Sequence, residues 1–222
     1  LLSIVFLIVS CSVDKPIKGA VVSAREEASK IGVEIMAKGG NAFDAMIATD
    51  LALTVCYPNA GNIAGGGFLV YRLNNATTGS LDYREKAPLA ASENMYLDEQ
   101  GNVIEGKSTL GGMAVGVPGT VAGLEAIHKK FGSLPWKDLV QPAIDLARNG
   151  YRVTTKQEAS FESKKDDFIQ LNGENTFYAQ GFKAGDLVRN TALANTLERI
   201  ATKGSAGFYQ GENAENLIKR IQ

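Results

Sequence analysis

Residues 38–61, KGGNAFDAMIATDLALTVCYPNAG, give the clearest structural signal in the chain. The pair Gly39-Gly40 is a typical helix stop, and Asn41 is a favoured N-cap for the next helix. From position 42 to about position 56, apolar side chains fall on nearly every face of the expected helix. A helix of that kind is normally buried between other elements. We therefore predict a buried helix over 42–56.

The residues before this helix predict a short strand and a first helix. Residues 20–22 (Ala-Val-Val) are a short apolar strand candidate. Ser23 is followed by Glu26 at the spacing of a capping box, which predicts that the first helix begins there. This helix is expected to end at Gly39-Gly40.

The rest of the chain predicts a hairpin followed mainly by helices. Strands are expected at 68–73 and 80–84, joined by a turn loop. Residues 89–110 predict irregular structure, and residues 154–190 predict small helices and exposed loops. Further helices are expected over 121–131, 136–140, 142–149 and 193–200, with Pro142 at the first position of its own helix. Many helices with few strands indicate the α+β class.

The composition excludes several classes of function. Of the 222 residues 45% are apolar, and 23 basic residues balance 24 acidic ones to a net charge of −1. This balance argues against a nucleic-acid-binding protein. Two cysteines cannot form a disulfide framework, and the single histidine, His128, excludes a multi-histidine metal site. A Ser-His-Asp triad would need His128, which reads more simply as a partly buried structural residue. We expect no metal and no cofactor.

The first 18 residues have the pattern of an export segment. Residues 1–9 are almost entirely apolar, which is too short for a membrane helix and fits the apolar core of a secretory signal. The run Ile-Val-Ser-Cys at 8–11 resembles a bacterial lipobox, in which the cysteine, here Cys11, is lipidated. Residues 12–18 would then be a tether. This predicts export to the bacterial periplasm or cell envelope, with membrane contact by a lipid anchor at most. The alternative is a plain signal peptide with an incidental Cys11.

The last residues predict a helix that lacks a stop signal. Leu217, Ile218 and Ile221 keep helical spacing up to Gln222 without a capping glycine. We expect the natural chain to continue, which makes residues 19–222 a partial domain.

Six ordered stretches together resemble one enzyme family. Any single one is a weak signal, but six in the right order are specific. They resemble the large-subunit region of γ-glutamyltranspeptidases (glutathione hydrolases), with one departure at Ala64, where the family tends to have another glycine. The stretches are KGGNAFDA (38–45), GNIAGGGF (61–68), DYREKAP (82–88), GVPGTVAG (116–123), QPA with ARNG (141–143 and 147–150) and GFYQG (207–211).

The resemblance implies an N-terminal-nucleophile hydrolase. In such enzymes the precursor cleaves itself, and the exposed N-terminal threonine of the small subunit becomes the nucleophile with its own amino group as base. That threonine lies beyond the region covered here, so no catalytic residue is assigned to this chain. The implied fold is a four-layer αββα sandwich shared with the small subunit, of which this chain would be a helix-rich part.

The resemblance carries one functional residue over to this sequence. Arg84 matches the arginine of the family's Asp-Phe/Tyr-Arg-Glu motif, which holds the α-carboxylate of the γ-glutamyl group. A guanidinium offers a rigid pair of donors that match a carboxylate. The alternative is a strand-end arginine paired with Asp82 or Glu85, which would contribute little. Gly65–Gly67 is expected to be scaffold and not a ligand contact.

The resemblance implies a γ-glutamyltransferase or glutathione hydrolase precursor. It would cleave γ-glutamyl amides such as glutathione through a γ-glutamyl ester, and pass the γ-glutamyl group to water, amino acids or peptides. Its partner would be the small subunit from the same precursor. Two alternatives stay open at this point. One is a related acylase or poly-γ-glutamate transpeptidase, and the other is a non-catalytic binding lipoprotein.

Overall fold

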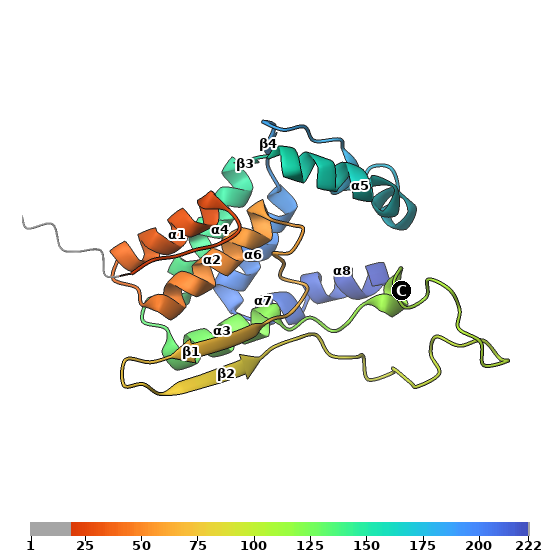
Figure 1. The fold of residues 1–222 in the computed structure, drawn as a ribbon, viewed down its shortest axis with the longest axis horizontal. Helices are drawn as coiled ribbons and strands as arrows, with labels where there is room; N and C mark the ends of the chain where they lie inside the picture. Colours follow the sequence, from red (N-terminus) through yellow and green to blue (C-terminus); the bar gives the residue numbers. More distant parts are fainter. Residues whose placement is uncertain (1–18, 222) are drawn as a thin grey trace, which may run out of the picture.

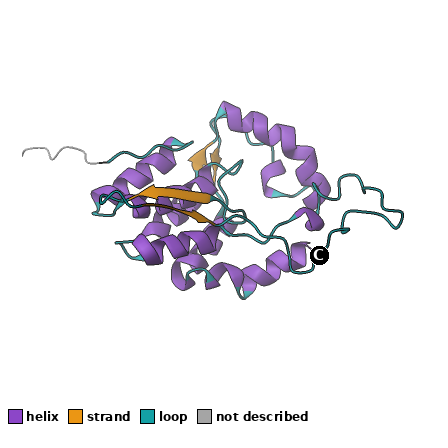
Figure 2. Cartoon of the chain, turned by 60° about the horizontal axis from the view of Figure 1, so that its bottom comes forward, coloured by secondary structure: helices purple, strands orange, loops and turns teal. Residues whose placement is uncertain are grey.

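The computed structural model describes residues 19–221, and the predicted export segment with Cys11 lies outside this range. No helix between residues 19 and 221 is long and apolar enough to cross a membrane. Two small antiparallel sheets accompany a set of packed helices (Figures 1 and 2). In chain order the elements are α1 (Glu26–Ala37), α2 (Ala42–Cys56), β1 (Phe68–Arg72), β2 (Thr78–Asp82), η1 (Gly112–Ala114), α3 (Thr120–Phe131), α4 (Trp136–Asn149), β3 (Tyr151–Arg152), α5 (Thr155–Asn172), η2 (Phe177–Ala179), β4 (Leu187–Val188), α6 (Thr191–Lys203), α7 (Ala206–Tyr209) and α8 (Glu212–Ile221).

Helix α2 lies at the centre of the core, as predicted. Its N-terminus has a complete capping box, because the Asn41 side chain accepts from the backbone of Asp44 while the Asp44 carboxylate accepts from the backbone of Asn41. α2 packs against α1 on one side and α4 on another, and α4 packs in turn against α6. The predicted buried helix is confirmed, with Ile47, Leu51 and other side chains of α2 fully enclosed.

The prediction for the start of α1 is wrong. The N-cap is Arg25, without a side-chain cap, and not Ser23. The Ser23 hydroxyl instead donates to the Arg25 carbonyl oxygen at 2.8 Å. Residues 20–22 form no strand, because no other described segment pairs with them. Long-range contacts of the Arg25 side chain, described below, account for the shifted helix start.

Pro142 does not divide the following helix as predicted. α4 runs without interruption from Trp136 to Asn149 with Pro142 inside it. Leu139 and Val140 before the proline are as fully buried as Ala143 and Ile144 after it. Burial on both sides therefore outweighs the loss of one backbone hydrogen bond at the proline. α5 likewise forms one long helix where small helices were expected.

The β1–β2 hairpin is antiparallel, with Phe68 opposite Asp82 and Arg72 opposite Thr78. Alternate side chains, such as Leu69 and Leu81, turn toward the helices, while Val70 on the other face is exposed. The predicted hairpin is confirmed. After β2 the chain makes a long excursion away from the helices and returns at α3 (Figure 1). The helix-rich α+β class is confirmed.

Candidate functional site

Arg84 lies two residues after the end of β2, where the chain leaves the hairpin. Its backbone N–H donates to Oδ1 of Asp82 at 2.9 Å. Its guanidinium lies over the Phe68 ring, 5.7 Å from the ring centre. The Arg84 side chain is 65% exposed, and its Nε lies 3.9 Å from Oε2 of Glu85, which is a loose contact. The Asp82 carboxylate thus binds the main chain of Arg84, and the guanidinium remains free of a tight ion pair within residues 19–221.

The glycine-rich turn positions the backbone at Arg84. A methyl group added to Gly66 would come within 2.6 Å of the Arg84 Cα, so only glycine fits at this close approach. The Gly65 carbonyl oxygen accepts from the backbone of Gly119 at 2.7 Å and of Thr120 at 3.0 Å, which joins the turn to the start of α3. The turn thus packs against the Arg84 backbone as scaffold.

Arg84 borders a cavity of about 610 Å³ between the end of the hairpin and α3. Asp82, Glu85 and Lys86 also line it, so both signs of charge surround the opening. The floor is apolar and includes Ala122 and Ala126 of α3. Such a mouth suits a small zwitterion, because a charged group on the ligand finds an opposite charge at the rim.

Lys86 and Val117 close the base of the excursion beside this cavity. Their backbones form a two-hydrogen-bond bridge, with N–H to oxygen distances of 3.1 and 2.7 Å. The bridge places Lys86 in the wall of the cavity, a residue that the sequence motifs did not single out as functional. The sequence signal for this placement was the spacing of two residues from Arg84, because side chains at i and i+2 of an extended segment point to the same side.

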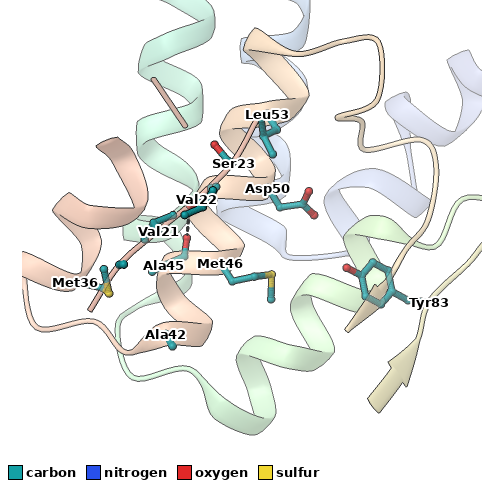
Figure 3. Close-up of a pocket in the computed structure, with 12 residues that line it drawn as sticks. Val21, Val22, Ser23, Met36, Ala42, Ala45, Met46, Asp50, Leu53 and Tyr83 are labelled. Carbon is teal, nitrogen blue, oxygen red and sulfur yellow. Dashed lines mark hydrogen bonds between the residues drawn. The ribbon is translucent and has the colours of Figure 1, made fainter. Parts of the chain in front are cut away.

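A second cavity, of about 390 Å³, lies on the other side of Tyr83. Tyr83 lines both cavities, and among residues 19–221 Asp50 of α2 is the only one with a formal charge in the lining of the second (Figure 3). Burial raises the pKa of the Asp50 carboxyl to about 6. Burial and the nearby Asp50 also raise the pKa of Tyr83. Sequence reasoning missed Asp50, whose only signal was an acidic residue in an otherwise apolar helix.

The other nucleophilic and titratable candidates have structural roles. The ring Nε2 of His128 hydrogen-bonds the Leu134 carbonyl oxygen at 2.8 Å, and the ring packs beside Trp136. Cys56 is fully buried, and burial raises the pKa of its thiol to about 12, so it is not a thiolate near neutral pH. Among residues 19–221, no group of three or more His, Cys, Asp or Glu side chains is placed to hold a metal ion.

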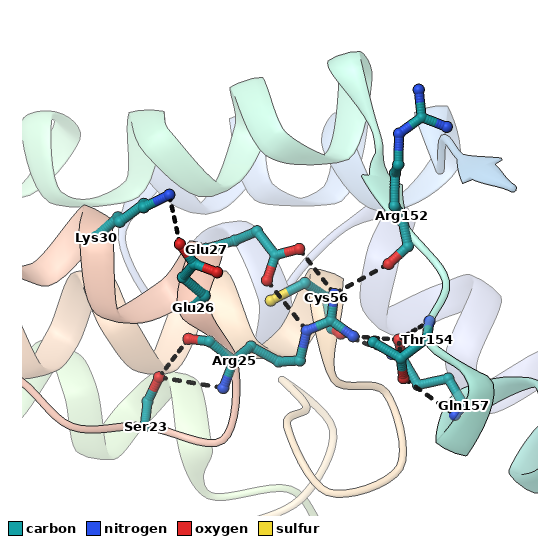
Figure 4. A network of polar contacts seen from close by, with 9 residues as sticks. All are labelled: Ser23, Arg25, Glu26, Glu27, Lys30, Cys56, Arg152, Thr154 and Gln157. Atoms are coloured by element: carbon teal, nitrogen blue, oxygen red, sulfur yellow. Dashed lines mark hydrogen bonds and ion pairs between the residues drawn. The ribbon is translucent and has the colours of Figure 1, made fainter. Parts of the chain in front are cut away.

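A buried polar network connects α1, α2 and α5 (Figure 4). The Arg25 guanidinium donates to Gln157, to Glu27 and to the Arg152 carbonyl oxygen, the last at 3.0 Å. Gln157 in turn donates to the Cys56 carbonyl oxygen at 2.8 Å, at the end of α2. The network joins three helix ends, and it accounts for the position of Arg25 as N-cap of α1.

Comparison with known proteins places the chain among relatives of one kind. Residues 28–222 match the family model described as gamma-glutamyltranspeptidase. The chain is 47% identical over 206 residues to a glutathione hydrolase proenzyme of Pseudomonas aeruginosa, covering 92% of this chain and 36% of that protein. A crystal structure of Helicobacter pylori gamma-glutamyltranspeptidase superposes with a TM-score of 0.87 at 44% identity, covering 90% of this chain and 59% of that one.

A more distant structural relative is the Bacillus anthracis transpeptidase enzyme CapD, with a TM-score of 0.74 at 29% identity over 90% of this chain and 64% of that one. The chain spans little more than a third of the length of the curated relatives it matches. The ordered motifs, the helical core with its hairpin, and the family match over residues 28–222 agree. The chain belongs to the γ-glutamyltranspeptidase family.

Proposed function

We propose that this chain is the N-terminal part of a γ-glutamyltransferase or glutathione hydrolase precursor, and that residues 19–222 form part of its large subunit. The observation that carries the proposal is the position of Arg84. Its guanidinium lies at the rim of a cavity of about 610 Å³ and has no tight ion pair within residues 19–221. A guanidinium in that position can bind a carboxylate with two parallel hydrogen bonds.

In this proposal Arg84 binds the α-carboxylate of a γ-glutamyl group. A fixed carboxylate sets the distance to the scissile amide and turns the γ-carbonyl toward the nucleophile. The nucleophile is a threonine in the polypeptide beyond this chain. Its oxygen forms an ester with the γ-carbonyl carbon, and the amide nitrogen leaves with a proton. Water or an amino acid then displaces the threonine oxygen and releases the γ-glutamyl group.

The names of the relatives support this reading. The Pseudomonas aeruginosa relative is a glutathione hydrolase proenzyme, which favours glutathione as a substrate and a partner subunit cut from the same precursor. The proposal extends to a four-layer αββα sandwich completed by that subunit. It also places the protein in the bacterial envelope, with residues 1–11 as export signal and Cys11 as lipid anchor.

The test is the kinetics of Arg84→Ala in the full-length precursor, with release of a chromogenic amine from a γ-glutamyl anilide as the assay. The expected result is a KM at least tenfold higher, because the lost contact is a charged hydrogen-bond pair of about 1.5–3 kcal/mol. Arg84→Lys should recover part of the loss, since it keeps the charge but not the two-pronged geometry. Arg72→Ala, at the exposed end of β1, is the matched control. Kinetics of Arg84→Ala equal to those of the control would refute the carboxylate assignment.

Substrate analogues separate this function from that of a related acylase. A γ-aminobutyryl anilide lacks the α-carboxylate but keeps the amine and the scissile bond. The proposed enzyme should turn it over poorly, and Arg84→Ala should not lower the turnover of this substrate any further. An acylase that ignores the α-carboxylate would accept it, and a non-catalytic lipoprotein would turn over neither anilide. A poly-γ-glutamate transpeptidase would instead prefer γ-linked glutamate chains.

A further inference from the structure

The cavity behind Tyr83 is an apolar groove that contains two polar side chains with no partner among residues 19–221. Its floor is one face of α2, including Ala45, Met46 and Asp50. Figure 3 shows the Asp50 carboxylate and the Tyr83 hydroxyl pointing into the space between α2 and the end of the hairpin. Within residues 19–221 neither group makes a side-chain hydrogen bond or an ion pair. An anion in such surroundings is unfavourable until a cation or donor reaches it.

The other wall of the groove is an unpaired backbone edge. Residues 20–23 form neither helix nor strand, and the segment with Val21, Val22 and Ser23 runs straight along the groove (Figure 3), with Val22 94% exposed. They make no backbone hydrogen bond to any other residue between 19 and 221. An extended edge with free N–H and C=O groups is a template for another extended segment. This feature fits a polypeptide occupant better than a small molecule.

The charge of the groove specifies one feature of that occupant. In the described part of the chain, Asp50 is the only formally charged residue that lines the groove, and Tyr83 is the only other titratable one. A lysine or arginine side chain would neutralise the carboxylate, and the Tyr83 hydroxyl can accept a hydrogen bond from the same cation. The thioether of Met46 and neighbouring apolar groups suit the aliphatic stem of such a side chain.

We propose that Asp50 is the docking point for a lysine or arginine side chain of an extended segment that belongs to the precursor's remaining polypeptide and lies beside residues 20–23. This inference rests on the proposed function, because it takes the chain as part of a longer precursor. The curated relatives are long enough to supply such a segment, since this chain spans 36% of the length of the Pseudomonas aeruginosa protein.

The test compares the melting temperature of the full-length wild type with that of Asp50→Asn between pH 5 and 8. A bound cation lowers the pKa of Asp50 well below 6, so the wild type should melt several degrees higher than the variant throughout this range. If the carboxylate stays unpaired, its pKa remains near 6, above the unfolded value. The wild type would then lose stability relative to the variant as the pH rises toward 6, and would melt lower than the variant above it. A wild type that melts lower than Asp50→Asn above pH 6 would overturn the inference. Glu34→Gln, an exposed carboxylate on α1, is the matched control.

A second measurement identifies the partner residue. Acetylation of lysines and dicarbonyl labelling of arginines, read by mass spectrometry, should show one basic residue outside residues 1–222 that reacts at least fivefold faster in Asp50→Asn. No such residue would refute the docking. A different result, in which n-butylammonium raises the melting temperature of the wild type but not of Asp50→Asn, would show a site for free amines and also overturn it. Turnover of the γ-glutamyl anilide tests the proposed function separately. If the precursor is active but no basic residue is protected by Asp50, the docking is refuted and the proposed function stands.

Discussion

The backbone N–H of Arg84 donates to the side chain of Asp82 at 2.9 Å, so the nearest carboxylate in the motif binds the main chain of the arginine and not its guanidinium. This contact holds the turn after β2 in one conformation. It also leaves the guanidinium available to a ligand, since the next carboxylate, Glu85, lies 3.9 Å away.

The first prediction concerns Asp82. In the full-length precursor, Asp82→Ala should raise KM for the γ-glutamyl anilide about threefold to tenfold, because loss of one hydrogen bond worth about 1 kcal/mol loosens the backbone at Arg84. Asp82→Asn keeps an acceptor oxygen and should come close to the wild type. Steady-state kinetics check both. A drop in KM for Asp82→Ala would instead mean that Asp82 competes with the substrate for the guanidinium.

The second prediction concerns Gly66. An alanine methyl group at this position meets the Arg84 Cα at 2.6 Å, so Gly66→Ala must push the two backbones apart. We expect a loss of about 1–3 kcal/mol in the free energy of unfolding, as for other overpacked sites, together with a raised KM. Urea denaturation and anilide kinetics measure the two effects. Ala64→Gly, at an exposed position of the same turn, is the control and should change neither by much.

The third prediction concerns the pH dependence of the Arg25 network. Burial alone would raise the pKa of Glu27, but the hydrogen bonds and the charge of Arg25 outweigh burial and lower the pKa. A lowered folded-state pKa stabilises the fold above the unfolded value of about 4.3, and this stability is lost as the pH falls through the folded-state pKa.

Glu27→Gln should therefore cost about 1 kcal/mol at pH 6–7, and the difference from wild type should shrink below about pH 4. Urea denaturation at several pH values measures it. Glu26→Gln is the control, since the Glu26–Lys30 pair is exposed to solvent and should contribute little to stability. Equal losses for the two variants would contradict a special role of the buried network.

The fourth prediction concerns Cys11. If Cys11 carries a lipid, the precursor made in a bacterial host should incorporate labelled palmitate and sediment with membranes. Cys11→Ser should abolish both. Cys56→Ala, which changes the only other cysteine in the sequence, should keep the label. A wild-type protein that is exported without label would favour the plain signal peptide.

Local sequence signals predicted the elements whose structure depends on near neighbours. Asn41 caps α2 through a residue three positions away, and the apolar pattern of α2 matches its burial. Both the cap and the burial of this helix could therefore be predicted from the sequence. The start of α1 could not be predicted in this way, because Arg25 is held by Gln157 and Arg152, which lie 132 and 127 residues further along the chain. Pro142 was misread for a related reason, since burial against α2 and α6 decides the continuity of α4.

The candidate site was only partly predictable for the same physical reason. Arg84 came from a resemblance, because a strand-end arginine has no distinguishing pattern of its own. Asp50 and Tyr83 are far apart in sequence, and their relationship exists only once the hairpin lies beside α2. A carboxylate in an apolar helix is a weak signal until its neighbours are known.

The bridge between Lys86 and Val117 closes the base of the excursion from 87 to 116 with its own pair of hydrogen bonds, and the excursion touches α8 near its second end, at η1. Lengthening such a loop at its tip costs little closure entropy. The bridge keeps the two ends of the loop together when residues are inserted there. Epitope tags or fluorescent labels placed near the tip, around Asp98 to Gly101, are therefore suited to follow maturation of the precursor without displacing the arginine.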